Sequence, residues 1–198
     1  MTSPRVKVGV VGVGHLGKEH VRLYSELPEC ELVGIHDANP DVQNKFAKKY
    51  KVCAFNSVEE MALGVDAVSV VVPTHAHFEV AKIFLETGRH VFVEKPITET
   101  TDQAGALVRL AQESALVLQV GHVERFNPVM SYLEREVRGP RFIEAHRLSP
   151  YPGRGTDVSV VLDLMIHDLD VVMHLVKSPL VSIDAVGVPV LSRTEDIA

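Results

Sequence analysis

The amino-acid sequence predicts an α/β fold in which a doubly wound parallel sheet is followed by a second unit of helices and antiparallel strands. Short apolar runs alternate with amphipathic segments as far as residue 121. These runs are nearly continuous, which is typical of strands covered by helices on both faces. Beyond Gly121 the pattern changes. We therefore expect two domains, at residues 1–122 and 123–198.

In the first domain each apolar run is followed by a segment of helical periodicity. Pro40 opens one helix, the capping-box pattern Ser57-x-x-Glu60 opens the next, and Gly88 ends a later one. The strands are expected at 6–12, 30–37, 52–55, 66–73, 90–96 and 116–122, and the helices at 15–29, 41–50, from 57 onward, at 79–90 and at 100–115.

The second domain is expected to begin with a crossover helix at 125–137. Residues 141–149 alternate apolar with polar side chains, as a half-exposed antiparallel strand does. A Pro/Gly-rich loop at 151–157 leads to a long apolar segment, 158–176, which fits a buried helix. A last strand is expected at 180–192, where it could expose an apolar edge.

The composition restricts the class of protein. The chain has 198 residues, of which 46% are hydrophobic and 23% charged, and this is typical of a globular protein. Its net charge of −6 is spread without a basic stripe, so we expect no nucleic-acid partner. We see no signal peptide and no membrane-spanning run, and the two cysteines make no disulfide framework. A cytoplasmic location without a membrane partner is the expectation.

The first predicted strand ends in the motif Gly12-x-Gly14-x-x-Gly17. A glycine-rich turn without a ligand is the alternative, but here the glycines follow a strand and open a helix, as in dinucleotide-binding folds. Gly12 would permit a tight turn, Gly14 would let the backbone approach a pyrophosphate, and Gly17 would let helix and strand pack closely. His15 and Leu16 complete the predicted cofactor-binding turn.

An acidic residue ends the second predicted strand. Asp37 would accept hydrogen bonds from the ribose hydroxyls of an adenosine, as its position relative to the glycines predicts. Its carboxylate would repel a 2′-phosphate, and no arginine lies close after it. We therefore expect NAD as the cofactor rather than NADP.

The segment Glu94-Lys95-Pro96 follows the strand predicted at 90–96, where ligands of open α/β folds bind. A lysine there can hydrogen-bond a substrate hydroxyl and stabilise the alkoxide that develops as hydride leaves. A solvated surface lysine is the equally weighted alternative. Pro96 fixes the backbone behind Lys95 and is a candidate for a cis peptide bond.

Asp163 and His167 are four residues apart in a predicted helix, so they share one face, and Asp170 and His174 continue the stripe. An aspartate one turn before a histidine can set its tautomer and make it a general base. A metal site and a polar stripe that satisfies backbone groups at the domain junction are the alternatives. The cost of burying Asp and His among apolar residues favours the catalytic interpretation.

Thr74 follows the fourth predicted strand and could approach a cofactor, and His122 lies at the domain junction, where it could line a cleft. A metal site at His75 and His77 is not expected. We interpret the other histidines, including His20, as surface or packing residues.

Taken together, the glycine motif, the segment PTHAHFEVA (73–81), Glu94-Lys95-Pro96 and Asp163-x-x-x-His167-x-x-Asp170 resemble the Gfo/Idh/MocA family of oxidoreductases. The resemblance implies a Rossmann domain at 1–122 and a partial substrate and oligomerisation domain at 123–198. It also implies an enzyme that transfers hydride between NAD(P) and a sugar or cyclitol hydroxyl. We expect no metal at the site. In that case Lys95, Asp163 and His167 would be catalytic, Glu94 would meet the nicotinamide ribose, and Thr74 and His77 would lie beside the cofactor.

Two further segments, GHVERFNP (121–128) and VVLDLMIHDLD (160–170), resemble family members that act on nucleotide-linked amino sugars of the UDP-N-acetylglucosamine type. Arg125, Asn127 and Arg147 would then be candidates for contacts with the substrate or the cofactor. An aldose or cyclitol dehydrogenase and a non-catalytic dinucleotide-binding protein are the alternatives.

The chain departs from the family pattern in two ways. A glycine triplet common before the aspartate–histidine helix is absent, and most family members are much longer. We therefore expect most of the sheet of the second domain to be missing. Since that sheet commonly forms the subunit interface and one wall of the substrate pocket, homo-oligomerisation is possible but its interface would be incomplete.

Overall fold

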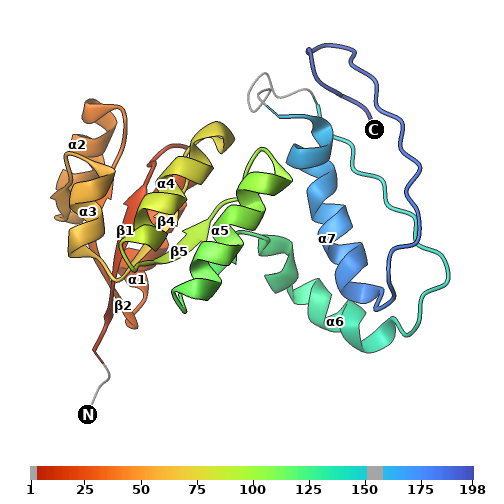
Figure 1. The fold of residues 1–198 in the computed structure, drawn as a ribbon, viewed down its shortest axis with the longest axis horizontal. Coiled ribbons are helices and arrows are strands. Elements are labelled where there is room, and N and C mark those ends of the chain that lie inside the picture. Colours follow the sequence, from red (N-terminus) through yellow and green to blue (C-terminus); the bar gives the residue numbers. More distant parts are fainter. Residues whose placement is uncertain (1–3, 151–157) are drawn as a thin grey trace. The chain divides into compact units, whose positions relative to one another are not determined.

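The structure, a computed structural model, describes residues 4–150 and 158–198 (Figure 1). The chain divides into two compact units, Met1–Gly121 and His122–Ala198, and each is described by itself. No helix in the described ranges is both long and apolar enough to cross a membrane.

The first unit contains the predicted parallel sheet, with six strands in the order β3-β2-β1-β4-β5-β6. Every neighbouring pair is parallel. The chain builds the sheet outward from β1 to β3, then crosses back to place β4 on the other side of β1. The carboxyl ends of β1 and β4 therefore meet at the point where strand order reverses, which is where open α/β sheets bind ligands. The strands are β1 (Val6–Val11), β2 (Cys30–His36), β3 (Cys53–Ala54), β4 (Ala67–Val70), β5 (His90–Val93) and β6 (Leu118–Val120).

Five helices cover the sheet and form two hydrophobic clusters with it. One cluster, built on Val10 and Ile35, includes Val21 of α1 and Ala47 of α2. The other joins the strands to α3, α4 and α5, with Phe84 fully buried. Two clusters on one sheet are what a doubly wound arrangement requires, as the sequence predicted. The helices are α1 (Gly17–Glu26), α2 (Pro40–Tyr50), α3 (Val58–Gly64), α4 (Thr74–Glu86) and α5 (Thr101–Glu113).

The start of α4 differs from the prediction, which placed this helix at 79–90. The helix begins at Thr74, directly after Pro73. Pro73 is the N-cap, with an extended ψ of 148°, and as a proline it carries no N–H that would need a partner ahead of the helix. Thr74 and His77 therefore lie in the first turn of a helix and not in a loop.

The second unit begins with a 3₁₀ turn, η1 (Val123–Phe126), and the helix α6 (Pro128–Glu136), which together replace the single helix predicted at 125–137. The predicted helix at 158–176 is also divided. A π-helical stretch, η2 (Val161–Met165), precedes the α-helix α7 (Ile166–Leu175). The loop predicted at 151–157 lies outside the described residues.

The two strands predicted in the second unit, 141–149 and 180–192, do not form. Among the residues described there, pairing is limited to an isolated antiparallel bridge between Val188 and Ile197. The alternating pattern of a strand specifies which face would be buried, but the strand also needs a neighbour to receive its backbone hydrogen bonds. Without one the apolar side chains stay exposed, and Val181 is 95% exposed.

Candidate functional site

The glycine-rich turn joins the carboxyl end of β1 to α1. Gly12 has a φ of +86°, and a Cβ there would lie 2.3 Å from the carbonyl oxygen of Val71. A Cβ on Gly17 would lie 1.9 Å from the carbonyl oxygen of Gly12. Both glycines are therefore required for the tight turn and close packing that the sequence predicted. A Cβ on Gly14 meets no atom within 4 Å, so the turn leaves open space at this position.

The N-terminus of α1 faces the same turn. Leu16 is its N-cap, and no side chain in the described part of the protein caps this helix. Gly14, His15 and Leu16 are all exposed. The first N–H groups of a helix carry partial positive charge, so an exposed helix start without a side-chain cap can receive an anion.

Asp37 is fixed beside the glycine-rich turn. Its Oδ2 accepts a hydrogen bond from the N–H of Val13 at 2.7 Å, and its Oδ1 accepts one from the N–H of Asn39 at 2.8 Å. The N–H of Asp37 donates to Oε1 of Gln43 at 2.8 Å, and Nε2 of Gln43 donates to the carbonyl of Phe55 at 2.9 Å. Each carboxylate oxygen keeps a lone pair for a further donor such as a ribose hydroxyl.

Glu94 lies directly after β5 and is only 8% exposed. Its Oε1 is 3.1 Å from Nε2 of His20, and its Oε2 accepts a hydrogen bond from the N–H of Lys95 at 3.3 Å. Nδ1 of His20 is 3.2 Å from Oγ of Ser69, which is 2.8 Å from the hydroxyl of Tyr24. His20 is thus a packing residue, against Phe92, and it also hydrogen-bonds to a candidate site residue, a contact that the sequence did not predict.

The peptide bond between Lys95 and Pro96 is cis, as the sequence suggested. His77 is 1% exposed, and its two ring nitrogens lie 2.8 Å from the carbonyl oxygens of Pro96 and Val72. The ring thus connects the segment after β5 to the segment after β4. Thr74 is buried in the same first turn of α4.

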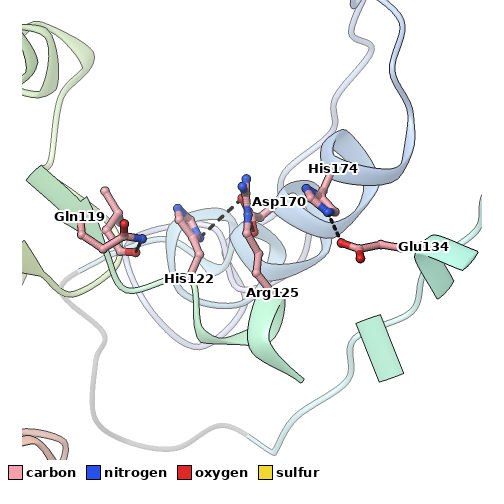
Figure 2. A network of polar contacts seen from close by, with 7 residues as sticks. Gln119, His122, Arg125, Glu134, Asp170 and His174 are labelled. Carbon is pink, nitrogen blue, oxygen red and sulfur yellow. Dashed lines mark hydrogen bonds and ion pairs between the residues drawn. The ribbon is translucent and has the colours of Figure 1, made fainter. Parts of the chain in front are cut away.

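Within the second unit, α7 is tied to η1 and α6 by the ion pairs that Figure 2 shows. Nε of Arg125 donates to Oδ2 of Asp170 at 2.7 Å, and the guanidinium makes a second bond to Oδ1. The hydrogen bond from Arg125 lowers the pKa of Asp170. Nδ1 of His122 lies 3.9 Å from the same carboxylate, and His174 pairs with Glu134.

The other two predicted substrate residues also have partners in the second unit. Arg147 binds the carboxylate of Asp168 through two donors, each at 2.8 Å, and this hydrogen bonding lowers the pKa of Asp168. Oδ1 of Asn127 accepts a hydrogen bond from the N–H of Val129 at 3.1 Å and so caps α6. Each arginine keeps three of its five donors for a further ligand.

Asp163 lies in η2, and His167 lies at the start of α7. The sequence argument assumed α-helical geometry, in which residues four apart share a face. The π-helical hydrogen bonding of η2 alters that register, and such single π turns are frequent at functional sites. In the part of the chain that the structure describes, no group of three or more His, Cys, Asp and Glu side chains is placed to hold a metal ion.

The predicted residues thus fall into two groups. The glycine-rich turn, Asp37, Glu94 and Lys95 follow β1, β2 and β5 at the carboxyl edge of one sheet, where His77 and Thr74 follow β4. Asp163 and His167 belong to the second unit together with the paired arginines. The sequence analysis did not identify His20 and Gln43 as residues that support the site. Burial of a polar side chain on a helix would have indicated such a role, but burial cannot be read from the sequence alone.

A doubly wound sheet with an open glycine-rich turn at its switch point defines the first unit as a Rossmann-type dinucleotide-binding fold. A family model described as an oxidoreductase family with an NAD-binding Rossmann fold matches residues 6–122. The chain belongs to this Gfo/Idh/MocA family, and the resemblance seen in the sequence motifs is confirmed.

The relatives include dehydrogenases of sugars and cyclitols. The chain is 41% identical over 194 residues to UDP-N-acetylglucosamine 3-dehydrogenase of Acidithiobacillus ferrooxidans, a match that covers 98% of this chain and 61% of the relative. A solved structure of that dehydrogenase is similar with a TM-score of 0.91 at 40% identity, covering 98% of this chain and 64% of the solved one. Inositol 2-dehydrogenase of Rhizobium meliloti is 25% identical over 199 residues, which cover 95% of this chain and 60% of that relative. The chain therefore spans less than two thirds of the length of these relatives.

Proposed function

We propose that this chain carries the cofactor site and the catalytic residues of an NAD-dependent dehydrogenase that acts on a sugar CH–OH group. The observation that supports it most is the open space at Gly14 beside the start of α1, with Asp37 after β2 on one side and Glu94-Lys95 after β5 on the other. A dinucleotide with its diphosphate at the turn would extend over both.

The cofactor in this proposal is NAD rather than NADP. Asp37 is held in place by two backbone N–H groups, so its carboxylate stays at the end of β2. A carboxylate in that position accepts hydrogen bonds from ribose hydroxyls and repels a 2′-phosphate. The composition further leads us to infer the cytoplasm as the location, where the two free cysteines would remain reduced.

Bound NAD⁺ would supply the hydride acceptor. In the proposed reaction Lys95 donates a hydrogen bond to the substrate hydroxyl oxygen and stabilises the developing alkoxide. His167 accepts the hydroxyl proton as general base, and Asp163 fixes the tautomer of the imidazole. The carbinol C–H bond breaks as hydride leaves, the O–H proton passes to His167, and a carbonyl group remains.

We propose a nucleotide-linked amino sugar as the substrate, because the relative with 41% identity is named as a dehydrogenase of UDP-N-acetylglucosamine. Arg125, Asn127 and Arg147 remain the candidate substrate contacts. The donors that each arginine does not use on aspartate would suit a diphosphate. A cyclitol is the second candidate, supported by the match to an inositol dehydrogenase over 95% of this chain.

The test is the formation of NADH by the chain with UDP-N-acetylglucosamine, N-acetylglucosamine or myo-inositol as the substrate. Lys95→Ala and His167→Ala should keep NAD⁺ binding and lose most turnover. Lys82→Ala and His146→Ala are the controls. Lys82 is half-buried on α4, where it pairs with Glu86 and lies over the ring of Phe78, and His146 is exposed and pairs with Glu144. Undiminished rates in the first two variants would contradict the proposed roles. NAD⁺ binding without turnover on any of the three substrates would favour the non-catalytic alternative.

A further inference from the structure

A chain of four polar side chains crosses the interior of the first unit and ends at Glu94. Its members come from α1, β4 and the segment after β5: the hydroxyl of Tyr24, Oγ of Ser69, the ring of His20 and the carboxylate of Glu94. Ser69 is fully buried, and the side chains of His20 and Glu94 are 17% and 10% exposed. Buried polar groups are retained where they are hydrogen-bonded, and these four satisfy one another.

The donor and acceptor of each hydrogen bond in this chain follow from the Glu94 carboxylate at its end. An ionised carboxylate only accepts, so Nε2 of His20 donates to Glu94 and, in the neutral ring, Nδ1 accepts. The hydroxyl of Ser69 then donates to Nδ1, and the hydroxyl of Tyr24 donates to Ser69. Burial raises the pKa of Tyr24, which keeps its hydroxyl protonated and able to donate. The ring of His20 is further fixed by an edge contact with Phe92, at a centroid distance of 5.4 Å.

Gly121 provides the space for the Glu94 carboxylate on another side. A Cβ built on Gly121 would lie 3.0 Å from Cδ and from both carboxylate oxygens of Glu94. The N–H of Gly121 bonds to the carbonyl of Val93 at 2.8 Å, so this backbone is held against the end of β5. The Glu94 carboxylate thus lies between the His20 ring on α1 and the backbone of Gly121, where a larger residue would contact it.

The position of Glu94 after β5 indicates what the hydrogen-bonded chain from Tyr24 to Glu94 could do. Asp37 follows β2 and Glu94 follows β5, on opposite sides of the switch between β1 and β4. With a diphosphate at Gly14, one nucleoside of a dinucleotide lies toward Asp37 and the other toward Glu94. We propose that His20 is a positioning residue which, together with Gly121, holds the Glu94 carboxylate ready for the nicotinamide-side ribose. This inference rests on the proposed function, since it requires NAD at this edge.

The experiment compares the affinities of NAD⁺, ADP-ribose and ADP, measured by calorimetric titration of the chain. ADP lacks the second ribose, and ADP-ribose carries it without nicotinamide. His20→Phe preserves a ring of similar size and removes both hydrogen bonds. It should raise the Kd of NAD⁺ and of ADP-ribose about tenfold, because the second ribose of each ligand would lose its hydrogen bond to the misplaced Glu94 carboxylate. The Kd of ADP should change less than about twofold.

Two further variants keep the test independent of a folding defect in His20→Phe. His20→Gln retains an amide donor that can reach Glu94 and should restore most of the NAD⁺ affinity. Gly121→Ala displaces the carboxylate without touching α1 and should reproduce the selective loss. His146→Phe is the control, since His146 is exposed and lies in the other unit.

The outcomes separate this inference from the proposed function. Suppose that the parent chain binds NAD⁺ and that the ratio of NAD⁺ to ADP affinity is unchanged in His20→Phe and Gly121→Ala. This result would overturn the role of His20 and leave the proposed function standing. An equal loss of affinity for NAD⁺ and ADP would assign His20 a general structural role and would also overturn it. Failure of the parent chain to bind NAD⁺ would overturn both.

Discussion

Replacing Gly14 by alanine tests whether the turn after β1 receives a diphosphate. A Cβ at Gly14 has no neighbour within 4 Å, and its φ lies outside the left-handed region, so alanine fits the ligand-free protein. The same methyl group would occupy the space through which a phosphate approaches the N–H groups at the start of α1. We therefore expect Gly14→Ala to fold normally and to bind NADH weakly.

The expected increase in the Kd of NADH follows from the number of hydrogen bonds to phosphate that the methyl group would obstruct. A hydrogen bond to a charged group contributes about 1.5–3 kcal/mol, and about 1.4 kcal/mol is a tenfold change in Kd. Loss of one phosphate bond should raise the Kd of NADH at least about tenfold, and loss of two about a hundredfold or more. The free energy of unfolding without ligand should rise by about 0.4–1 kcal/mol, because alanine restricts the unfolded chain.

The assay is a titration followed by NADH fluorescence, which is free of tryptophan emission because the chain has no tryptophan. Gly105→Ala is the matched control: it lies inside α5, and its Cβ would meet only the flexible end of Arg109, at 3.4 Å. This control should gain stability and keep the parent Kd. If Gly14→Ala binds NADH as tightly as the parent, or unfolds, the reasoning about the turn is refuted.

Three further results are expected. Phe84→Ala, in the fully buried core of the first unit, should lower the free energy of unfolding by about 3–5 kcal/mol in denaturant titrations, and a loss below about 1 kcal/mol would contradict the core assignment. Asp37→Ser should shift the ratio of NAD⁺ to NADP⁺ affinity toward NADP⁺ in calorimetric titrations; an unchanged ratio would remove Asp37 from the ribose site. Asp168 and Asp170 have lowered pKa values in the folded chain, so their pairing stabilises it fully above the unfolded aspartate pKa of about 3.9 and is lost as the pH falls through the lower folded values. The free energy of unfolding should therefore fall over that acidic range in the parent, and an equal fall in the Asp168→Asn/Asp170→Asn double variant would contradict this.

The first unit was largely predictable because its signals are local. The spacing of Gly12, Gly14 and Gly17 encodes a turn whose geometry depends on a few consecutive residues, and the structure has that geometry. The continuous apolar strands likewise predicted the parallel sheet. The onset of α4 was missed because Thr74 and the histidines after it are weak helix formers, so the start was placed at the more regular segment from residue 79.

The missed features depend on contacts between distant residues. His20 and Glu94 are 74 positions apart, and the pairs of Arg125 with Asp170 and of Arg147 with Asp168 span 45 and 21. The local sequence around a single histidine or arginine does not predict which distant residue it will pair with. The strands expected at 141–149 and 180–192 failed for a related reason: alternation predicts a buried face, but the partner strand is not a local property.

A crystal structure of the chain with NAD⁺ tests most directly whether a dinucleotide lies across the carboxyl edge of β1 and β4. We expect the diphosphate at Gly14 and the start of α1, the adenosine ribose at Asp37 and the second ribose at Glu94. A dinucleotide bound elsewhere on the chain, or none in crystals grown at saturating NAD⁺, would contradict this.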